Sequence, residues 1–196
     1  MRYNFPAIVL VLALGLGSPA ALAETETIGS LHLDYDNPVL RPASPAQRRL
    51  VAAYRAAMAG RANGGQMLTA LDHPASAACP DTLEQRYFGA YLKRADRIAP
   101  IPADAKVIFV PLRPGTDLPF AGGPMTRNPV EPSAVLAISY RKTEGGKPGQ
   151  TLRLISRSLI EQIALSDGQW RIVRPCLTQA GAARARQRMD AEARAH

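Results

Sequence analysis

Hydrophobic residues recur with the spacing of an α-helix in the first half of the chain. Leu50, Tyr54 and Met58 follow one another at every fourth position, which is the repeat of one helical face. Ser44-Pro45 precedes this stripe, and a serine N-cap followed by proline at the first helical position is a typical helix start. Gly60 favours an end. We therefore predict one amphipathic helix that buries a single stripe.

A second helical pattern begins about twenty residues farther on. Asp81 with Glu84 three residues later is the reciprocal capping-box arrangement, and Tyr87 and Tyr91 follow at helical spacing within a wider apolar face. A short helical piece over residues 66–71 precedes it. We expect this second helix to be the main lid of the core, and its two tyrosines are candidate ligand- or partner-binding residues.

The second half of the chain shows the pattern of β-strands. Residues 106–110 and 134–140 are short runs of β-branched and aromatic residues, and residues 151–165 form a longer run. Asp167-Gly168 is a tight-hairpin signal, and hydrophobic and basic residues alternate after it. The end of the chain is therefore predicted to be an antiparallel meander.

The apolar residues of the longest predicted strand change face. Leu152 and Leu154 fall on one parity, whereas Leu159, Ile163 and Leu165 fall on the other. Such a change usually marks a β-bulge or a strong bend, as in a curved sheet. The predicted fold class is α+β, with N-terminal helices packed on a curved, cone-like antiparallel sheet.

Turn-forming residues and charges suggest how the chain is divided. After a leader at 1–23 we predict an N-terminal arm or short strand over 24–43, a single α+β domain over 44–179, and a charged tail over 180–196 that is a solvated helix or frayed. Proline and glycine crowd residues 111–132, and a loop of this length without regular structure is usually functional or mobile. This loop is a candidate edge of a site.

The first 23 residues have the features of a secretory signal peptide. Arg2 is followed by an apolar run over 5–16, and Ala21 and Ala23 form a small-x-small cleavage pattern before Glu24. The run is shorter than the about 20 residues that a permanent anchor needs. No later stretch is long and apolar enough to cross a membrane. We expect a soluble mature protein that is periplasmic or secreted.

The chain has two cysteines, Cys79 and Cys176. An oxidising compartment favours a disulfide between an even pair, and closing a loop of roughly 100 residues is worth about 4.7 kcal/mol in the chain-entropy model. The alternative is a nucleophilic cysteine served by His73, but a reactive thiolate needs a base oriented by a third group, which spacing in the sequence does not show. We predict the disulfide.

The chain is basic, with 24 Lys and Arg side chains against 16 Asp and Glu, a formal charge of +8 that falls to +7 when the single arginine of the leader is removed. Exposed positive charge attracts anionic surfaces and ligands. An anionic surface, a small ligand or an envelope protein is therefore a candidate partner. No nucleic-acid-binding motif occurs, and we expect no nucleic-acid partner.

Basic and aromatic residues of the predicted strands are candidates for binding a ligand or partner. They are Arg153, Arg157, Arg171 and Trp170. Alternate residues of a strand share a face, so the first two arginines would form a cationic strip if no bulge intervened. The alternative role of these arginines is to keep the outer face of the sheet solvated and to resist edge pairing.

Candidate catalytic chemistry is sparse. Asp72-His73 is the one adjacent acid and imidazole in the body of the chain, and a histidine can act as a base where a carboxylate orients it. The alternative is an exposed bend set by Pro74. No nucleophile elbow, phosphate loop, dinucleotide glycine pattern or zinc-protease motif occurs. With three histidines and two cysteines, we expect no metal and no cofactor.

Helices followed by a meander that closes with Asp167-Gly168-Gln169-Trp170-Arg171-Ile172-Val173 resemble the nuclear transport factor two-like superfamily, the cystatin-like α+β cone, over about residues 44–177. The resemblance implies a concave fold that can enclose a pocket. Members of this superfamily include isomerases, dehydratases, secretion-system subunits and pocketed binding proteins, so the fold does not select a function.

The sequence leaves three classes of function open. The first is an exported, non-enzymatic binding or accessory protein of the cell envelope that holds a small ligand or a protein partner. The second is a small-molecule isomerase-type enzyme with a cone pocket, in which Asp72 and His73 would carry the chemistry. The third is an envelope immunity or inhibitor protein that plugs an acidic active site with the 111–132 loop and the arginines. We favour the first.

Overall fold

The structure of the chain, a computed structural model, describes residues 24–60, 64–79, 100–116, 118, 125–144, 153–184 and 187. Structural statements below concern these residues. The helices are α1 (Pro45–Ala59), α2 (Gly64–Thr69) and α3 (Pro74–Ala77), with a 3-10 turn at Pro38–Leu40. The strands are β1 (Thr25–Ile28), β2 (Leu31–Asp34), β3 (Lys106–Pro111), β4 (Thr126–Arg127), β5 (Ala134–Glu144), β6 (Arg153–Ser166), β7 (Gln169–Ile172) and β8 (Cys176–Leu177).

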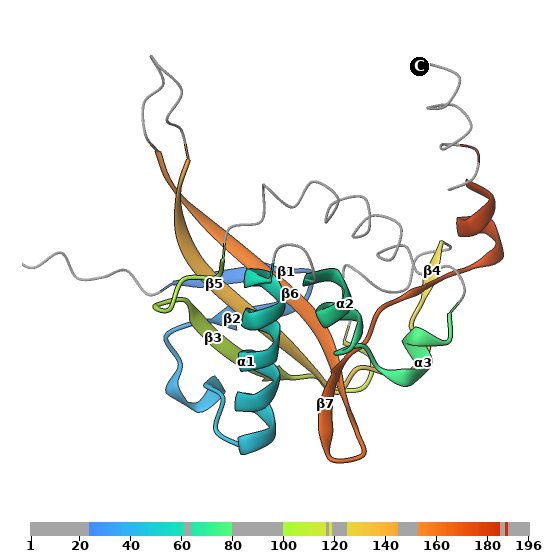
Figure 1. The fold of residues 1–196 in the computed structure, drawn as a ribbon, viewed down its shortest axis with the longest axis horizontal. Coiled ribbons are helices and arrows are strands. Elements are labelled where there is room, and N and C mark those ends of the chain that lie inside the picture. Colours follow the sequence, from blue (N-terminus) through green and yellow to red (C-terminus); the bar gives the residue numbers. More distant parts are fainter. Residues whose placement is uncertain are drawn as a thin grey trace, which may run out of the picture.

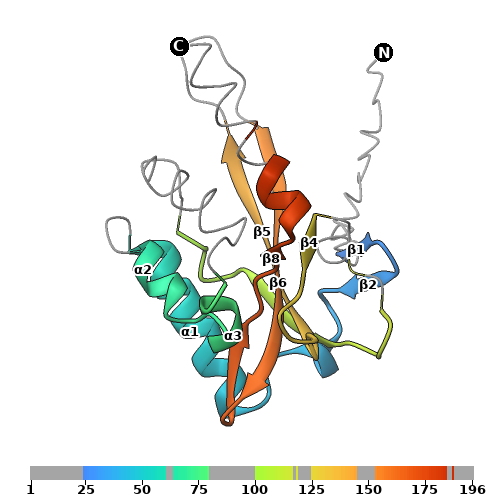
Figure 2. The same cartoon turned by 90° about the vertical axis from the view of Figure 1, so that its right-hand side faces the viewer.

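One four-stranded antiparallel sheet, in the order β3-β5-β6-β7, forms the centre of the fold (Figure 1), and β1-β2 and β4-β8 make two small sheets beside it. Figure 2 shows the main sheet between α1 to α3 on one side and the β1-β2 hairpin on the other. The predicted α+β class, with helices packed on an antiparallel sheet, is confirmed.

Helix α1 forms as its sequence predicts. The Ser44 hydroxyl accepts a hydrogen bond from the Gln47 amide at 3.1 Å, and the Gln47 side chain accepts one from the Ser44 amide at 2.9 Å. This capping box satisfies two amides that the first turn leaves without helical partners. The expected stripe of Leu50, Tyr54 and Met58 is buried and packs on the main sheet.

The core lies on both faces of the main sheet. On the central strand β5, Leu136 and Ile138 pack with α1, whereas Val135 and Ala137 pack with the β1-β2 hairpin, and all four are completely buried. Successive side chains of a strand point to opposite faces. A strand covered on both sides is therefore hydrophobic at every position.

The change of face in the longest strand was expected to mark a β-bulge or a strong bend, and the strand register excludes the bulge over the paired residues. Leu152, the first residue of that pattern, lies outside the described part. Strands β5 and β6 pair without an offset from Ala134 opposite Ile163 to Glu144 opposite Arg153. Apolar residues occur on both parities of β6 because Ile160 packs on the hairpin side while Leu159 and Ile163 pack on the helix side. No bulge is needed to explain the change of face.

The hairpin turn at Asp167-Gly168 is confirmed. Both residues have positive φ, 50° and 71°, the backbone that a two-residue turn with right-handed strand twist requires. The turn sets Ser166 opposite Gln169 and Leu165 opposite Trp170. Leu165 is 56% exposed, so β6 here extends beyond the packed core.

Two segments outside the predicted meander contain strands. Residues 24–43, expected to be an arm or a short strand, include the β1-β2 hairpin, and Leu33 and Tyr35 are buried against the main sheet. The loop predicted over 111–132 includes β4, which pairs with β8 through Thr126 opposite Leu177. The sequence did not reveal β4 because its partner strand is distant in the chain.

The beginning of the predicted tail is packed against the body of the protein. Residues 179–184 are helical, and Gly181 is buried. The Thr178 amide donates to the Met125 carbonyl at 2.9 Å, and an added Cβ at Gly181 would lie 2.1 Å from that same oxygen. This turn is therefore held against the segment that leads into β4, and only glycine allows so close an approach.

The second predicted helix, with Tyr87 and Tyr91, lies outside the described residues, as does the predicted leader. Among the helices that the structure describes, none has the length and apolar character needed to cross a bilayer.

Candidate functional site

A disulfide joins Cys79, at the end of α3, to Cys176 in β8, as the sequence predicts. The two Cα atoms are 5.8 Å apart, and 97 positions separate the cysteines in the chain, so the bond ties the helical layer to the last strand. Neither cysteine is free. The alternative of a nucleophilic thiol is therefore removed.

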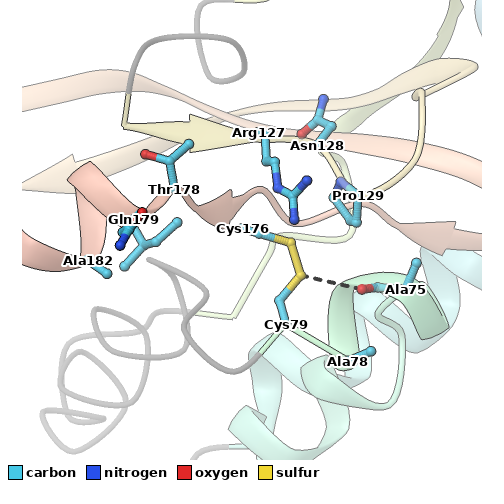
Figure 3. A pocket seen from close by; sticks show the side chains of 11 residues that line it. Ala75, Ala78, Cys79, Arg127, Asn128, Pro129, Cys176, Thr178, Gln179 and Ala182 are labelled. Atoms are coloured by element: carbon cyan, nitrogen blue, oxygen red, sulfur yellow. Dashed lines mark hydrogen bonds between the residues drawn. A yellow bond between two sulfur atoms is a disulfide. The ribbon is translucent and has the colours of Figure 1, made fainter.

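A groove of about 450 Å³ lies beside this disulfide. It is bounded by α3, by β4 with the residues after it, and by β8 with the helical turn that follows, as Figure 3 shows. Its described lining is Ala75, Ala78, Cys79, Arg127, Asn128, Pro129, Cys176, Leu177, Thr178, Gln179 and Ala182. Small apolar side chains and a few polar groups thus share the groove, which is the usual composition of a small-molecule site.

The one charged side chain of the described lining is Arg127. It is exposed and reaches from β4 towards the disulfide (Figure 3). The register of β4 and β8 sets the position of Arg127, because this residue pairs directly with Cys176. A guanidinium offers a planar set of donors that matches a carboxylate or a phosphate. The groove is therefore suited to a ligand with an anionic group.

Asn128 lines the groove beside Arg127. Its amide nitrogen donates to Oε1 of Gln162 at 2.7 Å, which fixes the side chain to β6. Its carbonyl oxygen is buried and has no hydrogen-bond partner among the residues that the structure describes.

A buried ionic cluster lies next to the groove. Nε of Arg174 is 2.7 Å from Oδ1 of Asp72, and these side chains are 6% and 2% exposed. Arg174 also faces Glu161, with 3.6 Å between Nη1 and Oε2. The Tyr54 hydroxyl donates to Oε1 of Glu161 at 2.7 Å. The cluster therefore joins α1, β6 and the segment before α3 beneath the surface.

Backbone pairing places Asp72 and α3. The His73 amide donates to the Ile172 carbonyl at 2.7 Å, and the Ile172 amide donates to the Leu71 carbonyl at 2.8 Å. Asp72 and Ile172 thereby form a single parallel β-bridge. The Arg174 amide donates to Oγ of the buried Ser76 at 3.0 Å. These bonds hold α3 at the end of the sheet, where Ala75 lines the groove.

Both sequence-predicted catalytic candidates have structural partners. Asp72 binds Arg174, and Nδ1 of His73 accepts the Ala75 amide at 3.2 Å as the N-cap of α3. An imidazole nitrogen that accepts from a backbone amide is held in one orientation. The two side chains therefore act separately, as an ion-pair partner and as a helix cap.

Two of the predicted binding residues, Arg171 and Trp170, have contacts within the fold. Arg171 donates to the Ala70 carbonyl at 2.8 Å and to the Gln169 side chain at 2.7 Å. Trp170 packs edge-to-face on Phe109 with ring centroids 6.0 Å apart. Both residues stabilise the fold locally.

The other predicted binding residues are described only in part or not at all. Arg153 and Arg157 lie in β6, opposite Glu144 and Tyr140, while their side chains fall outside the described part. Tyr87 and Tyr91 lie entirely outside it.

The sequence predicted the loop that borders the groove but did not single out the residues that line it. Arg127 and Asn128 lie within 111–132, the segment predicted to be a site edge, yet a two-residue strand has no hydrophobic pattern that would reveal it. Glu161 and Arg174 were missed because their pairing depends on distant segments. Within the described part, no group of three or more His, Cys, Asp or Glu side chains could hold a metal ion.

No protein-family model, curated protein or solved structure matches the chain.

Proposed function

We propose that this chain is an exported, non-enzymatic binding or accessory protein of the cell envelope. The groove beside the Cys79–Cys176 disulfide holds a small ligand through an anionic group. The observation that carries the proposal is the pairing of Arg127 with Cys176, which sets an exposed guanidinium in a groove of about 450 Å³. That volume suits a small organic ligand.

Binding is favoured over catalysis by the chemistry of the lining. Its described residues include no acid and no histidine, whereas acid–base catalysis needs a titratable group within hydrogen-bond reach of the substrate. Asp72 and His73 are occupied by Arg174 and by the N-terminus of α3. An arginine among small apolar side chains can hold a ligand without transferring a proton.

Export is supported by two features of different kinds. The first 23 residues have the order of a basic start, an apolar run and a small-x-small end. The disulfide joins the chain's only two cysteines, and such bonds persist in oxidising compartments. Kinship with the nuclear transport factor two-like cone is part of the proposal, supported by helices that precede an antiparallel meander with an Asp-Gly hairpin.

The experiment is a comparison of affinities by calorimetry or NMR titration. N-acetylalanine and phenyl phosphate are the anionic probes, and N-acetylalanine amide is the neutral control. Arg127→Gln should weaken binding of the anions about tenfold, or 1.4 kcal/mol. Arg49→Gln removes the same charge from an exposed position of α1 and should leave affinity unchanged. Equal losses in the two variants, or no saturable binding of either anion, would refute the proposal.

A further inference from the structure

Glu24 is anchored by its backbone on both sides. Its amide nitrogen donates to Oδ2 of Asp36 at 2.8 Å, and its carbonyl accepts from the Tyr35 amide at 3.0 Å. The next residue begins β1. Glu24 therefore closes the open end of the β1-β2 hairpin.

The Glu24 side chain is held by two strands of the main sheet. Ser139 of β5 donates to Oε1 of Glu24, and Nζ of Lys106 in β3 lies 3.5 Å from Oε2. Lys106 and Ser139 face each other directly in the β3-β5 register. The cross-strand pair of Lys106 and Ser139 thus binds the Glu24 carboxylate and holds the β1-β2 hairpin against the main sheet.

The charges at this point are unbalanced while residue 23 is attached. Lys106 serves both Asp36, at 2.6 Å, and Glu24, so two carboxylates share one ammonium. The Glu24 nitrogen is then a neutral amide. Hydrolysis of the bond between Ala23 and Glu24 adds one water, leaves a carboxylate on Ala23 and leaves an amine on Glu24, which takes up a proton at neutral pH. The α-ammonium would then be a second cation beside Lys106.

We propose that cleavage between Ala23 and Glu24 by an endopeptidase of the export pathway creates a structural ion pair between the new α-ammonium of Glu24 and the carboxylate of Asp36. The proposal rests on the export described above. The released terminus adds a positive charge beside Asp36 and closes the open end of the β1-β2 hairpin with an ion pair. Removal of the leader therefore also adds an ion pair to the folded protein.

The other charges around this nitrogen are few. The Asp36 amide donates to Oδ1 of Asp34 at 3.1 Å, which brings a further carboxylate close. Lys106 and Arg41 are the cations that act on Asp36. The Lys106 hydrogen bond holds the pKa of Asp36 below its usual range, so this carboxylate is ionised wherever the α-ammonium forms.

Two measurements test cleavage and pairing separately. The intact mass of protein recovered from the periplasm or medium tests cleavage, and the proposal expects a chain that begins at Glu24. The α-amino pKa tests pairing. It is measured by NMR on chains of residues 24–196 and 23–196, released from a fusion by a protease that leaves no extra residue.

The chain that begins at Glu24 should show an α-amino pKa about 0.5 units above the ordinary value of about 7.7–8.0, as expected for an exposed ion pair. Asp36→Asn should remove this rise. Glu26→Gln, a matched loss of charge in the same hairpin, should keep it. The chain that begins at Ala23 should show the ordinary value, because its ammonium lies about 3.8 Å farther along the chain.

An exported protein that retains the leader or starts elsewhere would overturn the cleavage site and the proposal with it. An α-amino pKa that is the same in wild type, Asp36→Asn and the Ala23 chain would overturn the ion pair and leave export standing. The comparison between the chains that begin at Glu24 and at Ala23 involves no substitution. It therefore tests the ion pair even if Asp36→Asn weakens the fold.

Discussion

The Arg174 guanidinium lies 2.7 Å from the carboxylate of Asp72, and almost no part of either side chain reaches solvent. The two residues are 102 positions apart. Their ion pair joins the segment before α3 to the chain between β7 and β8, and the disulfide joins the end of α3 to β8 a few residues later. The two links therefore hold α3 to the chain that follows β7.

Removal of Asp72 should strongly destabilise the protein. Asp72→Ala removes the shortest ion pair described for the buried Arg174 guanidinium, and breaking a buried pair typically costs about 3–5 kcal/mol. We expect a loss of about 3 kcal/mol in the free energy of unfolding, measured by urea denaturation. Asp104→Asn, at an exposed position, should change it by less than about 0.5 kcal/mol. Equal effects would contradict a structural role for the pair.

Gly181→Ala should destabilise the protein although alanine is the better helix former. In an ordinary helix this change is worth up to about 1 kcal/mol in favour of alanine. Here the new Cβ would lie 2.1 Å from the Met125 carbonyl oxygen, so the turn at 179–184 must move away. We expect a lower unfolding free energy and amide chemical-shift changes at Thr178 and Met125. A more stable variant with unchanged shifts would contradict the packing described.

The disulfide should contribute a large part of the stability. It closes a loop between residues 97 positions apart, for which chain entropy predicts about 4.7 kcal/mol and native disulfides typically give about 2–5 kcal/mol. Urea unfolding with and without reductant measures this difference. The Cys79→Ala/Cys176→Ala double variant should match the reduced protein and should not respond to reductant. Oxidised and reduced wild type of equal stability would rule the contribution out.

Tyr35 should titrate at a higher pH than an ordinary tyrosine. Burial raises its pKa well above the ordinary value of 10, and the carboxylates of Glu26 and Glu24 raise it further, against a hydrogen bond with Ser158 that lowers it. Because the folded pKa is the higher one, the stabilisation is present below pH 10 and is lost as the pH rises above it. Phenolate absorbance in an alkaline titration measures this, and Tyr35→Phe should remove the late step. A titration unchanged in Tyr35→Phe would contradict the burial.

Local signals were read correctly from the sequence. The start of α1 depends on Ser44 and Gln47, which are three residues apart, and the Asp167-Gly168 turn depends on two adjacent residues. Such features are governed by nearby backbone and side-chain bonding. The disulfide was predictable because the chain has one pair of cysteines and a leader-like start.

Features that depend on distant partners were not predictable. The change of face in β6 was interpreted as a bulge or a strong bend because nothing in that strand shows that the hairpin at 25–34 covers its second face. The pairing of Arg127 with Cys176 involves strands of two residues each, too short for a period to appear. Asp72 was weighed as a catalytic candidate because its partner Arg174 lies 102 positions away. In each case the missing information is a contact that only the folded chain creates.

The location of bound ligand tests the central claim most directly. With N-acetylalanine in excess, intermolecular nuclear Overhauser effects should connect the ligand methyl groups to the Ala75, Leu177 and Ala182 methyls, which line the groove beside the disulfide. The same experiment on Arg127→Gln should show weaker effects at the same ligand concentration. Contacts to methyls outside the groove, such as those of the exposed Val39, with none to the groove, would show that the ligand site lies elsewhere.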